Sequence, residues 1–118
     1  MNLEKLEEVL LSKNKATKEF PFDDKVMVFK VKNKMFALLL WKESPLRINL
    51  KCDPIDALAF REIYDCVKPG YHMNKKHWNT IHIDGSMEDR FLIDMIDDSY
   101  NLVVSKLTKK EKFELGNI

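Results

Sequence analysis

The sequence predicts an α+β fold, in which an antiparallel sheet carries helices packed on one face and the elements follow the order α-β-β-β-α-β-α. Four short segments have the β-branched content or the apolar–polar alternation that is typical of strands, and three segments have apolar residues at helical spacing. Three of the predicted strands are consecutive, so we expect them to pair as a meander. Helices that are segregated from such a sheet cover one of its faces and leave the other partly open.

The first half of the chain should contain one helix and three strands. Apolar residues at helical spacing predict an amphipathic helix over residues 2–12. A turn at 20–24 follows, and we expect its aromatic residues Phe20 and Phe22 to pack at the edge of the core. The predicted strands are residues 26–31, 35–41 and 46–51, and the first two form a hairpin around 32–34.

A second helix is predicted from Pro54 to about Tyr64. The Asp53 side chain can accept hydrogen bonds from free helical amides, and proline suits the first helical position. Four apolar residues are expected to form its buried stripe: Ile55, Leu58, Ala59 and Ile63.

The last strand and the last helix are predicted at 78–83 and from Ser86 to about Leu107. Ser86 and Asp89 have the spacing of a variant capping box. Residues 108–118 are polar, and we expect them to form a frayed end of a single domain that spans 1–118.

The composition favours a cytoplasmic protein, and among the open oligomeric states we favour a monomer. No run of about 18 apolar residues is present that could cross a membrane. The N-terminal residues lack the basic and apolar regions of a secretory signal. The two cysteines, Cys52 and Cys66, are not spaced as a metal-binding pair, so we expect buried free thiols in a reducing compartment.

The net charge of +1 conceals an uneven distribution. Residues 1–24 carry a net charge of −2, residues 25–82 carry +6, and residues 83–118 carry −3. A basic middle between acidic ends can form a basic face, which is the electrostatic signature of a protein that binds an anionic partner. The alternative is that these lysines only solvate the surface of the sheet.

The segment from Tyr71 to Thr80 combines aromatic, basic, histidine and amide side chains and contains no acid. Lys75 and Lys76 could contact phosphates, and Tyr71 or Trp78 could stack on a base or another flat group. Asn74 or Asn79 could pair with a base edge. The alternative is a structural corner, in which the aromatic rings pack on the helices and the polar groups hold the loop backbone.

The three histidines do not suggest a metal site. His72, His77 and His82 are spaced by five residues, and an odd offset places His77 and His82 on opposite faces of a strand. No cysteine or carboxylate completes a ligand set, and no glycine-rich phosphate loop or nucleophile motif occurs. We therefore expect no metal, no cofactor and no catalytic residue, although His72 or His77 beside a carboxylate could act as an acid–base catalyst.

The chain resembles the MmcQ/YjbR family along nearly its full length. The most specific matching block is Pro69-Gly70-Tyr71-His72-Met73-Asn74-Lys75-Lys76-His77-Trp78-Asn79-Thr80. The shorter matching pieces are Phe20-Pro21-Phe22, Val28-Phe29-Lys30-Val31, Lys34-Met35-Phe36-Ala37-Leu38, Asn49-Leu50-Lys51-Cys52-Asp53-Pro54 and Ser99-Tyr100-Asn101-Leu102-Val103-Val104. The resemblance implies a CyaY-like fold, like that of bacterial frataxin, and DNA binding through a proposed double wing. The acidic iron-binding ridge of frataxin is not evident in this sequence.

The sequence thus leads to a binding module without catalysis, and its first candidate partner is DNA. In that hypothesis Lys30, Lys32 and Lys34 of the hairpin act with Lys75 and Lys76 on phosphates. The alternative partner is a small anionic ligand or a protein held at the 71–80 segment. Its contacts would be Tyr71, His72, Lys75, His77, Trp78 and Asn79.

Overall fold

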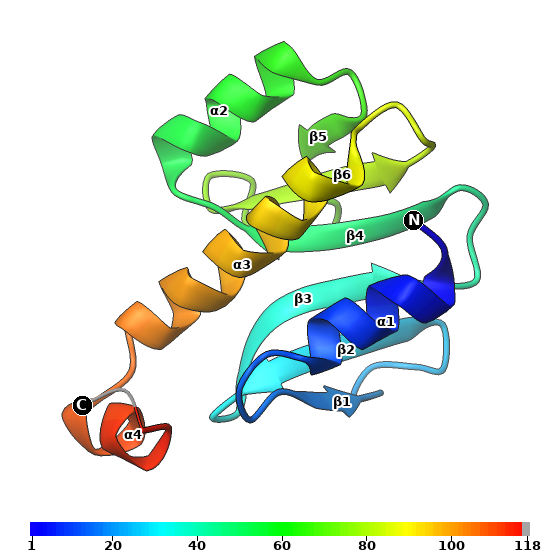
Figure 1. Cartoon of the computed structure of the whole chain (residues 1–118). Helices are drawn as coiled ribbons and strands as arrows, with labels where there is room; N and C mark the ends of the chain where they lie inside the picture. Colours follow the sequence, from blue (N-terminus) through cyan, green and yellow to red (C-terminus); the bar gives the residue numbers. More distant parts are fainter. Residues whose placement is uncertain (117–118) are drawn as a thin grey trace.

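A six-stranded antiparallel sheet with four helices forms the structure, a computed structural model that describes residues 1–116 (Figure 1). The α+β class and the antiparallel sheet confirm the prediction. The helices are α1 (Leu3–Leu11), α2 (Pro54–Ile63), α3 (Asp89–Ser105) and α4 (Lys109–Glu114). The strands are β1 (Thr17–Glu19), β2 (Val26–Val31), β3 (Lys34–Leu40), β4 (Leu46–Lys51), β5 (Val67–Pro69) and β6 (Trp78–Ile83).

The strand order is β1-β2-β3-β4-β6-β5, so the meander that the sequence predicts occupies the centre of the sheet. The β2–β3 hairpin turns at Lys32 and Asn33, which both have positive φ angles, as a tight hairpin turn requires. In the β4–β6 pair, Asn49 lies opposite Thr80 and Lys51 lies opposite Trp78. This register places the Asn49 and Thr80 side chains next to each other on the same face of the sheet.

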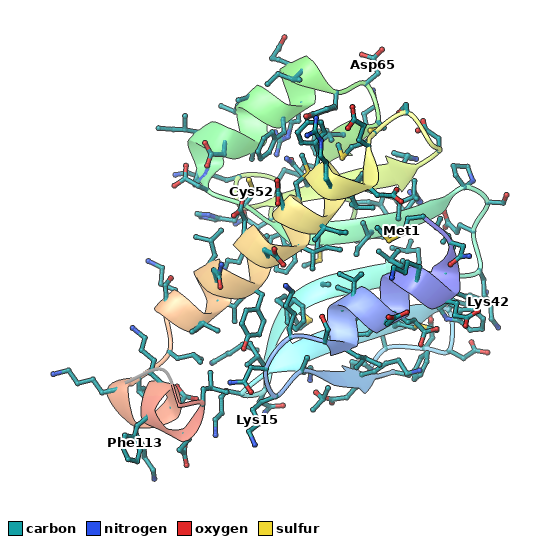
Figure 2. The ribbon with its side chains drawn as sticks, viewed as in Figure 1. Met1, Lys15, Lys42, Cys52, Asp65 and Phe113 are labelled. Carbon is teal, nitrogen blue, oxygen red and sulfur yellow. The ribbon has the colours of Figure 1, made fainter. Side chains whose placement is uncertain are left out.

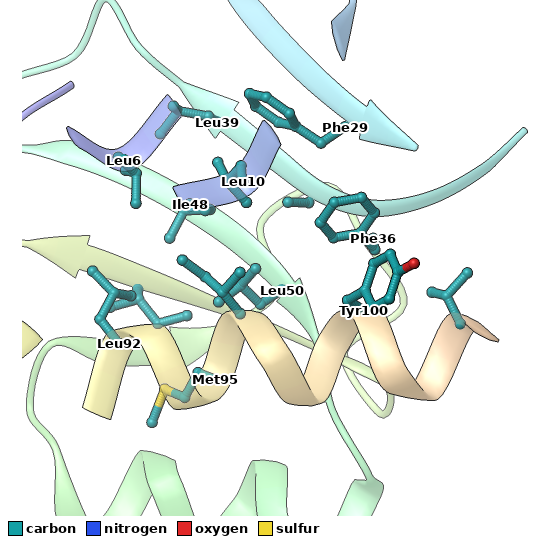
Figure 3. Close-up of a cluster of buried hydrophobic side chains, with 14 of the residues drawn as sticks. Leu6, Leu10, Phe29, Phe36, Leu39, Ile48, Leu50, Leu92, Met95 and Tyr100 are labelled. Atoms are coloured by element: carbon teal, nitrogen blue, oxygen red, sulfur yellow. The ribbon is translucent and has the colours of Figure 1, made fainter. Parts of the chain in front are cut away.

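One face of the sheet holds the main core. Leu6 and Leu10 of α1 and Leu92, Ile96 and Tyr100 of α3 pack on it (Figures 1 and 3). The ring of Tyr100 meets Phe36 edge to face, with 5.3 Å between ring centroids. Burial of these apolar side chains supplies most of the free energy that holds the helices to the sheet.

The predicted buried stripe of α2 is wrong. Helix α2 lies beside the short edge strand β5, and Ala57 is the helix residue that is fully buried (Figure 1). Ile55, Leu58 and Ile63 are 79%, 61% and 66% exposed, and Ala59 is exposed as well. The other side of the helix faces the protein through half-buried Phe60 and Arg61. The Asp53 cap is confirmed, because its side chain accepts a hydrogen bond from the Ile55 amide.

The remaining differences concern short elements and helix ends. Strands β1 and β5 contain three residues each, which is too short for an alternation pattern to be visible. The segment expected to fray contains α4, and a capping box between Thr108 and Glu111 stabilises the start of this helix. Residues 117–118 lie outside the described structure. Helix α3 begins at Asp89 without a side-chain cap, because the Ser86 hydroxyl donates to Asp84 instead.

Candidate functional site

The face of the sheet opposite α1 and α3 is apolar along its middle strands. Val28, Leu38 and Trp78 form a second buried cluster there. Three half-buried apolar residues pack against it: Val26, Met35 and Met73. Because β2 and β3 are apolar on both faces, the open face has an apolar surface of its own.

The loop between β5 and β6 folds over this face and is held by a closed set of hydrogen bonds. Thr80 Oγ1 donates to Asn49 Oδ1 at 2.5 Å and accepts from the Tyr71 amide at 2.8 Å. Asn49 Nδ2 donates to the Tyr71 carbonyl at 3.1 Å. Thr80 and Asn49 are buried, so these bonds fix the backbone of Tyr71 against the sheet.

A second anchor holds the far end of the same loop. Arg61 of α2 donates from Nε to Asn79 Oδ1 at 2.7 Å, and its guanidinium also donates to the Lys75 carbonyl. Asn79 Nδ2 donates to the carbonyl of Ala57 at 3.2 Å. The loop is therefore attached to the sheet at one end and to α2 at the other.

A groove of about 640 Å³ opens between this loop and the loop that precedes β2. Val26, Leu38 and Leu40 form its floor, and Tyr71, His72 and Met73 form one wall. The opposite wall consists of Phe22, Asp23 and Lys25, and Lys42, Glu43 and Asn49 complete the lining. A volume of this size lies within the range of small-molecule sites, about 300–1,000 Å³.

The wall at residues 20–25 is positioned by β3 and its following turn. Trp41 Nε1 donates to the Asp24 carbonyl at 3.0 Å, and the Lys42 ammonium pairs with the Asp24 carboxylate at 3.2 Å. This hydrogen-bonded pair lowers the pKa of Asp24 below its ordinary value. Phe20 and Phe22 do not plug the core edge as predicted, since they are 46% and 64% exposed.

The carboxylates around the groove already have partners. Glu43 receives two hydrogen bonds from Arg47, at 2.5 and 2.6 Å, which lower the pKa of Glu43 and raise that of Arg47. The Arg47 guanidinium also lies over the Tyr71 ring, 4.5 Å from its centroid. Asp23 accepts from the Lys25 amide at 2.7 Å.

Two polar groups of the groove have no such partner. Within residues 1–116, neither the Lys25 ammonium nor the His72 ring makes a hydrogen bond or an ion pair. The His72 ring lies 4.0 Å from that of Tyr71, and its backbone has a φ of 57°, an uncommon value for a residue other than glycine. The loop therefore holds this histidine in a strained conformation at the groove wall.

The structure separates the predicted residues of the 71–80 segment. Tyr71 and His72 line the groove, whereas Trp78 is buried in the apolar cluster of the open face and Asn79 is buried against α2. Two of the remaining residues hold the turn itself: Asn74 Oδ1 accepts a hydrogen bond from the Lys76 amide, and Lys75 Nζ donates to the Gly70 carbonyl. The Lys76 side chain is exposed and that of His77 is half-buried.

The hairpin lysines do not line the groove. Lys30 pairs with Glu19 at 3.4 Å and Lys32 pairs with Glu114 at 3.2 Å, so acids from both ends of the chain offset two of the predicted cations. Lys34 lies at a different hollow, at the end of the sheet.

Sequence reasoning missed the floor of the groove and its second wall, which include Val26, Leu38, Leu40 and Phe22. One signal could have found the floor. The segments 26–31 and 35–41 are apolar at nearly every position, whereas a strand with one solvated face should alternate.

Comparison with known proteins identifies the family. The family model described as YjbR matches residues 11–102, which is most of the chain. The chain belongs to the YjbR family. YbdF of Escherichia coli O157:H7 is 42% identical over 79% of this chain and 76% of its own length. YjbR of Escherichia coli K12 is 30% identical over 95% of both chains.

Solved structures of similar proteins share the fold. The crystal structure of Deinococcus radiodurans protein DR2400, which belongs to the domain family DUF419, superposes with a TM-score of 0.93 at 39% identity. That match covers 98% of this chain and 88% of DR2400. A Pseudomonas syringae crystal structure gives a TM-score of 0.76 at 26% identity, over 86% of this chain and 98% of that protein.

Two features are absent from residues 1–116 of this YjbR-family structure. Over residues 1–116, no helix is both long enough and apolar enough to cross a bilayer. The same residues contain no group of three or more His, Cys, Asp or Glu side chains that could hold a metal ion.

Proposed function

We propose that this YjbR-family protein binds, without catalysis, a small ligand that has a flat apolar body and one anionic group. The observation that supports the proposal is the groove of about 640 Å³, whose carboxylates are engaged while the Lys25 ammonium and the His72 ring are not. The two free cysteines suit a reducing compartment, so we also propose a cytoplasmic location.

The lining accounts for both parts of such a ligand. Leu38 and Leu40 offer an apolar floor, and Phe22 and Tyr71 stand on opposite walls, where their rings can cover a flat group. Lys25 can then pair with the anionic group of the ligand. Removing the ligand's negative charge should weaken binding more than it would in a purely apolar site.

Anilinonaphthalene sulfonate is a suitable first probe, because it combines fused rings with one sulfonate and fluoresces in apolar surroundings. We expect saturable binding at micromolar to millimolar concentrations. The neutral analogue phenylnaphthylamine should bind at least several-fold more weakly. Equal affinity for both probes would contradict the anionic part of the proposal.

Matched variants locate the probe. Phe22→Ser should weaken binding about tenfold, because Phe22 forms one wall of the groove. Phe113→Ser is the control, since Phe113 is similarly exposed at 69% but lies on α4 (Figure 2). If both variants bind alike, the probe does not occupy the groove and the proposal fails.

DNA is the second candidate partner. Its support is that, in the described part of the chain, Lys34, Lys75 and Lys76 have no ion pair with an acid. Titration of single- and double-stranded DNA at low salt should then show binding that weakens steeply as salt rises. The Lys76→Ala variant, which changes an exposed lysine, should lower that salt dependence and leave binding of the fluorescent probe unchanged. Absence of binding at tens of micromolar would contradict this candidate.

A further inference from the structure

A second hollow, of about 220 Å³, lies at the end of the sheet where β3 begins and β4 ends. Three lysines from different elements line it: Lys34 opens β3, Lys51 closes β4, and Lys106 follows α3. Its apolar walls are Met35, Trp78, Val103 and Leu107. No aspartate or glutamate is among the lining residues.

These three lysines differ from the lysines of this protein that form ion pairs with acids. Lys18, Lys30 and Lys32, for example, each pair with a glutamate at 3.0 to 3.4 Å. Within residues 1–116, the ammonium groups of the three lining lysines form no ion pair and no hydrogen bond with protein groups. Their charges are therefore not neutralised by the residues that the structure describes.

Glu111 is the acid whose pKa Lys34 influences, and it does not line the hollow. Glu111 of α4 accepts a hydrogen bond from the Thr108 amide at 3.0 Å, which is the main reason that its pKa is lowered. Lys34 and Lys32 lower that pKa further, but more weakly. Glu111 caps its own helix and does not line the hollow.

The backbone that carries the central lysine is firmly held. The Lys51 amide donates to Ser99 Oγ at 2.8 Å, and this buried hydroxyl donates in turn to the Phe36 carbonyl at 2.5 Å. This chain of bonds joins β4, α3 and β3 at the hollow. Lys51 thus starts from a fixed backbone position, so less order must be gained at this residue when a ligand binds.

The chemistry of the lining selects the ligand. Each lysine offers three donors and no acceptor, so three of them together favour a group with several acceptor oxygens and more than one negative charge. A tetrahedral phosphoryl group meets this requirement, and lysine binds phosphate as a point charge without the planar geometry that arginine imposes. The small volume leaves room for a phosphate or a small phosphate ester.

We propose that the hollow between β3, β4 and the end of α3 is a binding site for a phosphoryl group, either as free inorganic phosphate or pyrophosphate or at the end of a small organic phosphate. The site is separate from the groove, since the two share no lining residue. It can therefore exist whether or not the groove binds a ligand.

Chemical-shift titration of the ¹⁵N-labelled full chain tests the proposal, with phosphate, pyrophosphate and phenyl phosphate as separate probes at constant ionic strength. We expect pyrophosphate to shift the Lys51 and Lys106 amides and the Trp78 indole signal. The groove residues Leu40 and Tyr71 should not move. Comparison of the inorganic probes with phenyl phosphate shows which source of the phosphoryl group the site prefers.

Variants distinguish binding at this specific site from general electrostatic attraction of the anion to the protein. Lys51→Ala should weaken pyrophosphate binding about tenfold, and Lys51→Arg should restore most of the affinity because it keeps the charge. Lys68→Ala is the control, since this exposed lysine of β5 lies outside the hollow. Equal loss in Lys51→Ala and Lys68→Ala, or no shift with any of the three probes, would overturn the proposal. Shifts with a DNA duplex and none with the three probes would overturn it too, in favour of nucleic acid.

Discussion

Asn49 and Thr80 lie opposite each other on β4 and β6, and both bind the main chain of Tyr71. Thr80 Oγ1 donates a hydrogen bond to Asn49 and accepts one from the Tyr71 amide, so this one hydroxyl links Asn49 and Tyr71 in a single hydrogen-bonded network. Two buried polar residues on the open face thereby set the position of a groove wall. This arrangement explains how the loop can hold His72 at an unfavourable φ.

Replacing Thr80 with valine should detach the loop. The change keeps the shape of the side chain but leaves the Tyr71 amide and Asn49 Oδ1 without their partner. We expect a loss of about 1–3 kcal/mol in the free energy of unfolding, measured with urea. Binding of the fluorescent probe should weaken as well. Thr80→Ser keeps the hydroxyl and should retain both properties; an equally stable Thr80→Val protein would disprove the role of this set.

Gly70 is required by a close approach rather than by its backbone angles. A Cβ atom at this position would lie 2.8 Å from the Trp78 Cβ and 2.9 Å from the Trp78 carbonyl oxygen. The Gly70 amide donates to that same carbonyl at 2.9 Å, so the two segments of the chain cannot move apart without losing a hydrogen bond. We expect Gly70→Ala to cost about 1–3 kcal/mol in thermal or urea unfolding. Lys76→Ala in the same loop is the control, because this side chain is exposed, and it should leave the stability nearly unchanged.

The central strands were predictable because their β-branched content and apolar–polar alternation reflect a local preference for extended backbone. Residues 26–31 and 46–51 are strands with the predicted boundaries, and the predicted strand 78–83 is β6. The face on which a helix packs is a different kind of property, because it depends on what lies next to the helix. Helix α2 flanks the edge strand β5, so a regular apolar stripe faces outwards while Ala57 and Phe60 face the protein.

The candidate site was predictable only in part, for a similar reason. The composition of 71–80 identifies a loop with unusual side chains, and Tyr71 and His72 do line the groove. The other wall, at Phe22 and Lys25, lies nearly fifty residues away in the sequence and meets the loop only through the strand order. Pairing of Lys30 with Glu19 likewise depends on β1, which the sequence pattern did not reveal.

The exposed stripe of α2 gives a direct test of the packing. Leu58→Ala should change the free energy of unfolding by less than about 0.5 kcal/mol, because this side chain is 61% exposed. Ile96→Ala on α3 should cost about 2–5 kcal/mol, since Ile96 is fully buried under the sheet. Urea unfolding of the two variants measures the difference. A large loss in the Leu58 variant would mean that α2 packs through the stripe after all.

Asp98 should destabilise the folded protein at neutral pH. Burial raises the pKa of its carboxyl, and Asp94, Asp56 and Asp97 raise it further. The folded state therefore holds this proton more tightly than the unfolded state does, and stability falls as pH rises from about 4 through the raised value. Asp98→Asn should raise the midpoint of thermal unfolding at pH 7 by about 1–3 °C and have little effect near pH 3.

The neighbouring Asp97 provides the matched control for this pH dependence. Its carboxylate forms an ion pair with Lys13 just after α1, so removing its charge loses this attraction together with the weaker repulsion of Asp98. Asp97→Asn should therefore leave the unfolding midpoint unchanged or lower it at pH 7. The same upward shift in both variants would point to the total acidity of α3 instead of the surroundings of Asp98.

Cys52 should react slowly with thiol reagents although it is only half-buried. Burial raises the pKa of its thiol to about 11, and the carboxylates of Asp56, Asp98 and Asp53 contribute to the shift. At pH 7 about one Cys52 in ten thousand is then a thiolate, the form that attacks the reagent. Cys52 lies between the start of α2 and α3 (Figure 2), where these acids meet.

Iodoacetamide labelling followed by peptide mass spectrometry tests this and separates Cys52 from buried Cys66. Asp56→Asn removes the largest charge effect on the thiol and should speed labelling of Cys52 several-fold at pH 8. Asp65→Asn, which changes an exposed acid that does not affect the thiol, should leave the rate unchanged. Rapid labelling of Cys52 in the unmodified protein at pH 7 would contradict the raised pKa, since only a thiolate-rich cysteine reacts quickly under those conditions.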